Sequence, residues 1–118
     1  QMTRIHDILA AKRRLADMYL AEFTSCPLGT ILREPADCES NYWLNTLVLH
    51  DENKGLQETL LATAHENKLF LRPVWQPLHT LPAFAGAPSG PMPNTLSLAE
   101  RVINLPSSPT LLLPQWKA

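Results

Sequence analysis

The chain has 118 residues, a net charge of −1 and a hydrophobic fraction of 45%, which together fit one globular domain with an ordinary core. The near-neutral charge gives no general attraction to nucleic acid or to an anionic membrane surface. No apolar run is long enough to span a membrane, and no signal-peptide pattern is present, so we expect a soluble, cytoplasmic protein without nucleic-acid or membrane partners. Cys26 and Cys38 lack metal-ligand spacing, which argues against a zinc site. We expect two free thiols, with a disulfide between them as the alternative.

The first elements in chain order are a helix, two strands and a second helix. Residues 3–22 predict a helix, because apolar side chains recur at intervals of three and four, and Thr3 is expected to cap its start. Residues 30–33 predict a short strand. Residues 41–50 predict a central strand, rich in β-branched and aromatic side chains. Residues 55–68 predict the second helix, with its apolar side chains on one side.

The rest of the chain holds most of the 11 prolines and predicts extended pieces and turns rather than long helices. Residues 69–74 predict a strand. Residues 80–93 are too apolar for a free linker, so we expect them to pack across a surface of this protein or of a partner. A short third helix is expected to start at Asn94 or at Ser97, where a capping box is possible, and residues 102–106 predict a short strand.

This order of elements predicts an α+β fold with one small mixed or antiparallel sheet and helices packed on one of its faces. We expect residues 1–118 to form a single domain. No glycine-rich dinucleotide fingerprint or P-loop is present, so a nucleotide-binding α/β domain of those types is excluded.

The run from Arg72 to His79 carries most of the chemistry of this sequence. It places a guanidinium, the indole of Trp75 and an imidazole on eight residues that two prolines stiffen. Such a set is typical of a binding loop. Arg72 can hold a phosphate or carboxylate, or pair with a structural acid. Trp75 can form a ligand platform or part of the core, and His79 can act as a base, as an anion ligand or as a structural histidine.

No catalytic group is assigned from the sequence. No serine lies in a nucleophile motif, and no carboxylates mark a catalytic pair. The four lysines lie on helix faces, at helix ends or in the tail, where solvent keeps them protonated, so none is expected to form a Schiff base. The basic residues 12–14 are expected to form a solvated helix face, with a phosphate contact as the alternative.

Several motifs together resemble the C-terminal domain of the DegT/StrS-type sugar-nucleotide aminotransferases. They are the Arg72–His79 run, a Leu-Pro-Ala-Phe segment at 81–84, an Asn-Leu-Pro-Ser-Ser segment at 104–108, a Lys-Arg helix that continues to Tyr19, and an Asn-Tyr-Trp-Leu-Asn strand at 41–45. The resemblance covers nearly the whole chain. The ending is most similar to the branch that makes amino sugars of the legionaminic or bacillosamine kind.

The resemblance implies a pyridoxal 5'-phosphate-dependent enzyme of fold type I, which is a homodimer and transfers an amino group from glutamate to a nucleotide-linked 4-keto sugar. This chain would be its small C-terminal domain. The N-terminal domain with the cofactor-binding lysine would be absent, so that this fragment is inactive alone and binds no cofactor. Arg72, Trp75 and His79 would be substrate-binding residues, with no catalytic, cofactor-binding or metal-binding residue in the chain. Tyr42 and Trp43 would pack the core.

The alternative is a free-standing α+β module that binds an anionic ligand through the Arg72–His79 loop without catalysis. An upstream α/β region with a cofactor lysine distinguishes the two interpretations.

Overall fold

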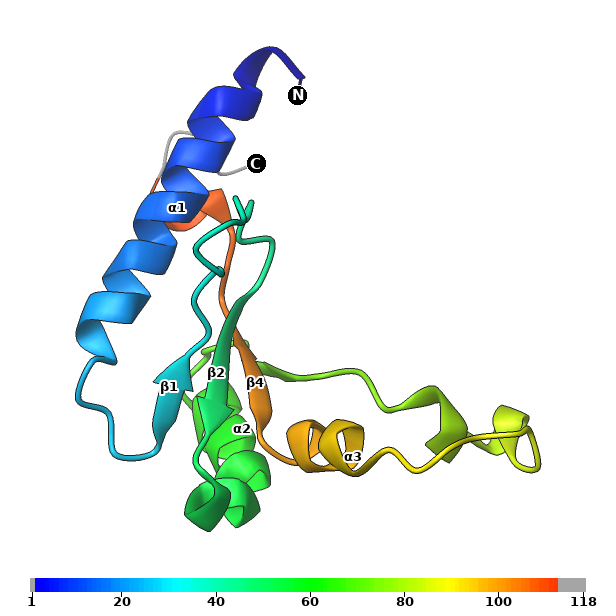
Figure 1. Ribbon diagram of the computed structural model, residues 1–118. Coiled ribbons are helices and arrows are strands. Elements are labelled where there is room, and N and C mark those ends of the chain that lie inside the picture. The colour runs from blue at the N-terminus through cyan, green and yellow to red at the C-terminus, as the bar shows by residue number, and fades with distance from the viewer. Residues whose placement is uncertain (1, 113–118) are drawn as a thin grey trace.

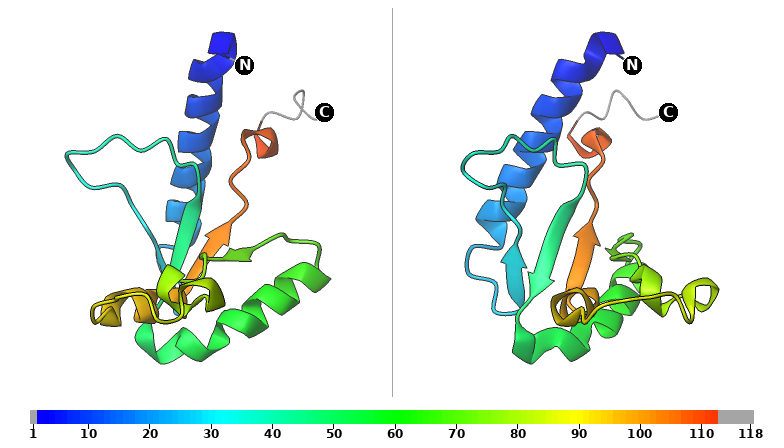
Figure 2. Two further views of the ribbon diagram at one scale, coloured as in Figure 1. Left: turned by 90° about the vertical axis from the view of Figure 1, so that its right-hand side faces the viewer. Right: turned by 45° about the vertical axis from the view of Figure 1, so that its right-hand side comes forward.

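The structure is a computed structural model that describes residues 2–112. It has a four-stranded sheet, with α1 (Ile5–Glu22) and α2 (Gln57–Glu66) packed against it and α3 (Pro93–Ala99) beside a protruding segment (Figures 1 and 2). The strands are β1 (Gly29–Ile31), β2 (Asn45–Leu49), β3 (Arg72–Pro73) and β4 (Val102–Leu105). They lie in the order β1-β2-β4-β3, and every neighbouring pair is antiparallel. The α+β prediction is confirmed, and of the two predicted sheet types the antiparallel one is present.

The core lies between the sheet and the two long helices. One face of the sheet contributes five buried aliphatic residues, which are Ile31, Leu47, Leu49, Ile103 and Leu105. The cross-strand register pairs Ile31 with Leu47 and Leu47 with Ile103, so these side chains leave the sheet on the same side. Tyr19, Leu20 and Phe23 of α1, with Leu60 and Leu61 of α2, pack against them. The opposite face of the sheet carries no helix in the described part of the chain.

The ends of several elements differ from the sequence expectation. Thr3 does not cap α1, which follows a short 3-10 helix and begins without a side-chain cap. The second helix is divided into a 3-10 segment at Asp51–Leu56 and α2 itself. The third helix begins with a proline at its first turn, as the fixed φ of that residue favours, and Ser97 lies inside it, so the capping box is absent.

The predicted strands are longer than the observed ones. Only residues 45–49 of the predicted strand 41–50, and residues 72–73 of the predicted strand 69–74, are extended in the sheet. The central strand β4 has four residues, and β3 pairs with only two of them, Ile103 and Asn104. β3 ends where its pairing with β4 ends.

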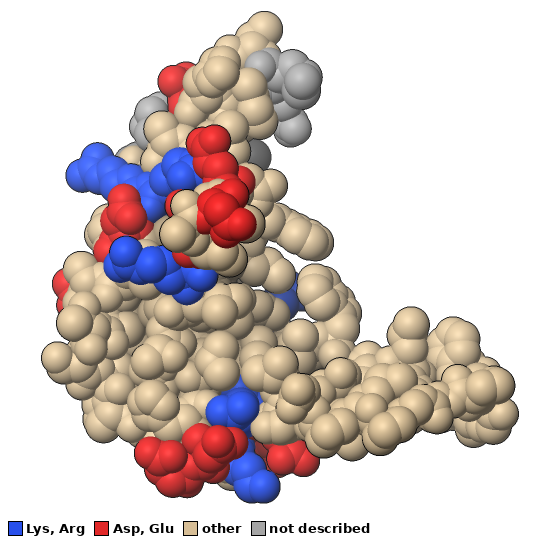
Figure 3. Space-filling view, in the orientation of Figure 1, with Lys and Arg blue, Asp and Glu red and all other residues tan. Residues whose placement is uncertain are grey.

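Residues 74–92 form an arm that leaves the sheet after β3 and returns through α3 (Figures 1 and 2). It contains two short 3-10 turns, Leu78–Thr80 and Pro82–Phe84. Most of its side chains are exposed, so the expected packing of residues 80–93 across this protein's own surface is not observed. No Asp, Glu, Lys or Arg occurs between Arg72 and Glu100, and Figure 3 shows the arm without a charged side chain. The alternative, that residues 80–93 pack on a partner, stays a prediction.

Candidate functional site

The uncovered face of the sheet carries a row of polar side chains across three strands. The register aligns Thr46 of β2 with Asn104 of β4, and Asn104 with Arg72 of β3. The Thr46 hydroxyl donates to Asn104 Oδ1 at 3.2 Å, and Asn104 Nδ2 donates to the carbonyl of Pro73 at 3.4 Å. Because β3 is only two residues long, these side-chain bonds add to a weak ladder and help to hold Arg72 in place.

Arg72 is exposed at the outer edge of the sheet, as β3 is an edge strand. Among residues 2–112 its guanidinium has neither an ion pair nor a hydrogen-bond partner, so the pairing with a structural acid that the sequence left open is not found there. Arg72 lines a cavity of about 500 Å³ together with Leu61 and His65 of α2. An exposed and always-charged guanidinium can bind an anion.

Trp75 is exposed over 68% of its surface, which corrects the alternative that it belongs to the core. Its ring centroid lies 6.1 Å from that of Trp43, with 36° between the planes. Trp43 is itself 66% exposed, so the expectation that it packs the core is wrong, whereas Tyr42 is buried as expected. The structure therefore brings together two indoles from distant parts of the sequence.

A left-handed turn explains why Tyr42 and Trp43 separate in this way. Tyr42 has a φ of +44°, an uncommon value for a bulky residue. The Tyr42 N–H donates to Ser40 Oγ at 3.0 Å, and the Trp43 N–H donates to Asn41 Oδ1 at 2.9 Å. The strict in-and-out alternation of a strand is broken at this point, so Tyr42 enters the core while Trp43 remains outside.

His79 lies on the arm, in the 3-10 turn Leu78–Thr80. It is half-buried and lines a cavity of about 370 Å³ with Phe84 and Met92. Arg72 and His79 therefore line different cavities, and Trp75, which lies between them in the sequence, lines neither. The structure does not gather the three predicted binding residues into one pocket. Their substrate-binding roles stay predictions.

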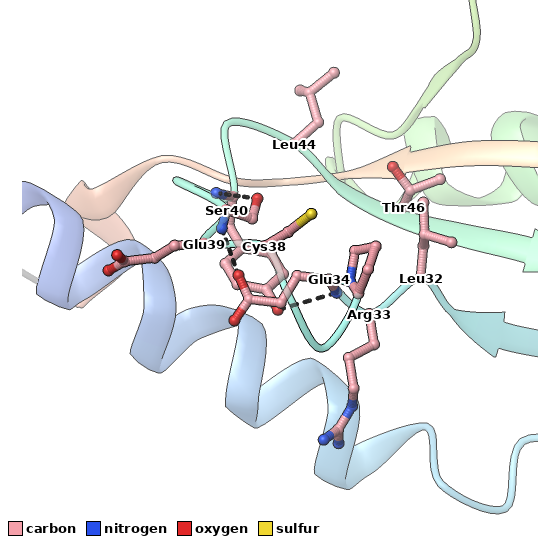
Figure 4. A pocket seen from close by; sticks show the side chains of 10 residues that line it. Leu32, Arg33, Glu34, Cys38, Glu39, Ser40, Leu44 and Thr46 are labelled. Atoms are coloured by element: carbon pink, nitrogen blue, oxygen red, sulfur yellow. Dashed lines mark hydrogen bonds between the residues drawn. The ribbon is translucent and has the colours of Figure 1, made fainter.

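Another cavity, of about 260 Å³, lies under the loop between β1 and β2 (Figure 4). Leu32, Leu44 and Thr46 line one side of it, and Figure 4 shows the Arg33 side chain extending away from the other labelled residues. Glu34, the half-buried acid of this loop, accepts a hydrogen bond from the Ser40 N–H and forms an ion pair with Arg13 at 3.5 Å. Its carboxylate is thus engaged in holding the loop to α1, and it is not a free catalytic group.

The basic residues at 12–14 are not simply a solvated face. Lys12 Nζ donates to the carbonyls of Tyr42 and Trp43, both at 3.3 Å, and of Ser107 at 2.7 Å. Burial lowers the pKa of this ammonium group. Arg13 pairs with Glu34 and with Glu39. Two of the three cations therefore fasten α1 to the loop and to the chain after β4.

The lysines of the described residues do not fit the attachment of a pyridoxal cofactor. The three N–H donors of Lys12 are taken by three backbone carbonyls, so its nitrogen has no free position for a carbonyl carbon. Lys54 is exposed and pairs with Glu100 at 3.9 Å, and Lys68 is exposed. Lys117 lies outside the described residues. Within residues 2–112 there is also no cluster of metal-ligating side chains and no helix long and apolar enough to cross a membrane, and both cysteines are free thiols.

A comparison with sequence models of known protein families identifies the family of this chain. The sequence model of the DegT/DnrJ/EryC1/StrS aminotransferase family matches residues 1–116. The chain belongs to this family. The resemblance found in the sequence motifs is thereby confirmed, and the matched residues include Arg72, Trp75 and His79.

Similar proteins agree with the family assignment. The GDP-perosamine synthase of Vibrio cholerae is 32% identical over 118 residues, which cover 99% of this chain and 32% of that protein. The structure of Helicobacter pylori PseC, an aminotransferase of pseudoaminic acid biosynthesis, matches with a TM-score of 0.86 at 16% identity over 94% of this chain and 30% of that one. DesI, solved in the presence of its TDP-sugar product, matches with a TM-score of 0.82 at 19% identity over 91% of this chain and 28% of that one. The chain thus spans about a third of the length of these DegT/DnrJ/EryC1/StrS relatives.

The sequence reasoning missed Trp43, Asn104 and Thr46 as members of the candidate site. Asn104 and Thr46 lie on the uncovered face only because of the strand register, which the sequence does not state. The Trp43 position depends on the left-handed turn at Tyr42. An Asn-Tyr-Trp run before an alternating strand is the one signal that could have suggested an irregular entry into β2.

Proposed function

We propose that the complete protein is a pyridoxal 5'-phosphate-dependent aminotransferase that transfers an amino group from glutamate to a nucleotide-linked 4-keto sugar. The reaction would take place in the cytoplasm and provide amino sugars for cell-surface polysaccharides. The observation that carries this proposal is the family match over residues 1–116. The similarity to a protein named GDP-perosamine synthase, and to one solved with a TDP-sugar product, supports a nucleotide sugar as the substrate.

In this proposal the chain is the small C-terminal domain of a homodimeric enzyme, and it recognises substrate without holding the cofactor. Arg72 is the residue for an anionic group, either the diphosphate of the sugar nucleotide or a carboxylate of glutamate, because its guanidinium is charged and unpaired within residues 2–112. His79 offers a second polar group, in a mostly apolar cavity of the arm that Ser89 and Thr95 also line. Trp75 contributes an aromatic surface between them.

The chain alone is proposed to be inactive, because no lysine within residues 2–112 fits a Schiff base. The cofactor would be bound by a lysine elsewhere in a longer protein, and the amino-transfer chemistry would belong to that cofactor. The complete protein should therefore form amino sugar from glutamate with added pyridoxal 5'-phosphate, while the 118-residue chain should not. Absence of any product with the complete protein and a range of nucleotide-linked 4-keto sugars would contradict the proposal.

To identify the nucleotide of the substrate, GDP-linked and TDP-linked 4-keto sugars are tested first, since these two nucleotides appear in the names of similar proteins. The legionaminic or bacillosamine branch remains a prediction from the end of the sequence. A product analysis by mass spectrometry and NMR identifies both the nucleotide and the aminated carbon.

The binding roles are tested with Arg72→Ala and His79→Ala in the complete protein. Loss of a charge-assisted hydrogen bond to substrate costs about 1.5–3 kcal/mol, so we expect KM for one of the two substrates to rise at least tenfold in Arg72→Ala. Arg14→Ala and His6→Ala are matched controls, as both residues lie exposed on α1. Unchanged KM values for glutamate and for the nucleotide sugar in both test variants would remove the assignment.

A further inference from the structure

The paired indoles of Trp43 and Trp75 are the largest aromatic surface that the described chain leaves in solvent. Each is exposed over about two-thirds of its area, 66% and 68% respectively, although the rings touch. Tryptophan is a residue whose burial is strongly favourable, so two adjacent exposed indoles mark a contact with another molecule more often than a solvated surface.

The backbone that carries both indoles is restrained in the absence of a ligand. The segment before Trp43 is fixed by the left-handed turn at Tyr42 and by Lys12 Nζ, which donates to the Tyr42 and Trp43 carbonyls. Trp75 lies between Pro73 and Pro77, whose fixed φ angles restrict the chain on both sides. A surface ordered in advance loses little conformational entropy on binding, and this favours a specific ligand.

On the Trp75 side of the pair, the surroundings suit a flat, uncharged ligand group. Residues 73–99 contain no Asp, Glu, Lys or Arg, so the indoles have no charged neighbour on that stretch of chain. Arg72, whose guanidinium has no ion pair within residues 2–112, lies three residues before Trp75. Three residues of extended chain span about 10 Å, which allows one ligand to meet the indoles with a planar group and Arg72 with an anionic group.

We propose that Trp43 and Trp75 together form the stacking platform for the nucleobase of the sugar nucleotide, with its diphosphate directed toward Arg72. This inference rests on the proposed function, since it names the part of the proposed substrate that the pair binds. A nucleobase has a π-face on either side and stacks on aromatic side chains whatever its identity. The two rings are tilted by 36° and their centroids are 6.1 Å apart, so the base is proposed to stack on an exposed face of one indole with the other beside it.

The test uses the complete protein and the variants Trp43→Leu, Trp75→Leu and Trp43→Phe. Stacking of a base on an aromatic residue is worth about 1–3 kcal/mol, so the affinity for GDP, measured by calorimetry, should fall at least about fivefold in each leucine variant. Trp43→Phe should keep most of the affinity, because a smaller ring still stacks. The inhibition constant of pyrophosphate, which has no base, should change less than twofold, and so should KM for glutamate. Leu69→Ala removes an apolar side chain of comparable exposure, 55%, and is the control expected to bind GDP normally.

Three outcomes would overturn the inference. GDP affinity could be unchanged in both leucine variants. KM for the nucleotide sugar could rise while GDP affinity does not, which would assign the indoles to the sugar ring. The melting temperature could fall with GDP affinity intact, which would assign them to packing against the remainder of a longer protein.

Failure of the proposed function has a different signature. In that case the unaltered protein forms no amino sugar, and the calorimetric titration with GDP and the leucine variants still decides whether the indoles bind a base. An active enzyme with unchanged GDP binding in Trp43→Leu rejects the platform and leaves the aminotransferase proposal standing.

Discussion

Lys12 and Ser107 are 95 positions apart in the sequence, yet Lys12 Nζ donates to the Ser107 carbonyl at 2.7 Å. The same ammonium group donates to Tyr42 and Trp43, so one side chain joins α1, the entry into β2 and the chain that leaves β4. Three motifs that are separate in the sequence therefore meet at one nitrogen atom. The arrangement fixes the end of the sheet from which Trp43 projects.

Replacement of Lys12 by methionine should destabilise the chain by about 1–3 kcal/mol, because the partly buried carbonyls of Tyr42 and Ser107 and the exposed carbonyl of Trp43 lose their donor. The free energy of unfolding is measured by urea denaturation followed by circular dichroism. Lys54→Met is the matched control, as that lysine is exposed and makes a single long ion pair, and it should cost less than about 0.5 kcal/mol. Equal effects of the two substitutions would contradict the role of Lys12 as a fastening group.

Replacement of Ser107 by alanine should be similarly destabilising, by about 1–3 kcal/mol. Ser107 Oγ accepts the backbone N–H of Asn45 at 2.7 Å and its side-chain amide at 3.2 Å, and it donates to the Leu105 carbonyl at 2.8 Å. Asn45 is 1% exposed, and water cannot replace the lost partner. Ser89→Ala, on the exposed arm, should change stability by less than about 0.5 kcal/mol in the same denaturation experiment.

Gly29 should not tolerate alanine. A Cβ atom built at this position lies 2.3 Å from the carbonyl oxygen of Val48 on the paired strand, a backbone atom that cannot move aside without breaking the β1–β2 ladder. We expect a loss of about 1–3 kcal/mol. At Gly55 the same atom meets nothing within 4 Å, so Gly55→Ala should be neutral or stabilising by about 0.4–1 kcal/mol. A melting temperature for Gly29→Ala equal to that of the unaltered chain would refute the close strand approach.

Tyr19 should make stability fall at alkaline pH. Burial raises the pKa of its hydroxyl, which donates to the Pro106 carbonyl at 2.9 Å. The stability that the protonated form contributes is complete below the unfolded pKa of 10.0 and is lost as pH rises through the folded value. Tyr19→Phe should therefore show a flatter decline of the free energy of unfolding above pH 10 than the unaltered chain.

The difference in the free energy of unfolding between the unaltered chain and Tyr19→Phe reports on Tyr19 alone, because Lys12 is present in both. The lowered pKa of Lys12 acts with the opposite sign, since its desolvation penalty is relieved as pH rises from the folded value toward 10.5. Parallel pH profiles for the unaltered chain and for Tyr19→Phe would contradict the assignment.

Hydrophobic periodicity was sufficient to predict the order of the elements, and it failed where tertiary pairing decides. The helices α1 and α2 follow the spacing of their apolar side chains. The predicted strands were too long because β4 offers few partners, a property of a different segment. Trp43, which the family resemblance placed in the core with Tyr42, lies outside it, because one positive φ at Tyr42 changes the side on which the next side chain lies.

In the candidate site, too, some residues could be predicted from the sequence and others depend on tertiary pairing. Arg72 and Trp75 could be selected from residue chemistry and from the prolines around them. Their neighbours could not, because Thr46 and Asn104 join Arg72 through the strand register, and Trp43 joins Trp75 across the end of the sheet. Proximity of Arg72 and His79 in the sequence also suggested one pocket, whereas His79 lies in the 3-10 turn Leu78–Thr80 of the arm and lines a different cavity from Arg72.

The uncharged arm has a practical consequence for mapping experiments. Trypsin cleaves after lysine and arginine and does not cleave before proline, so the Arg72–Pro73 bond resists it and the next site is Arg101. The whole arm, with Arg72, Trp75 and His79, is thus released on a single tryptic peptide, residues 69–101. A photo-reactive nucleotide that labels any of these residues would be found on one fragment, and chymotrypsin, which cuts at exposed aromatic and leucine side chains, would then separate the individual positions.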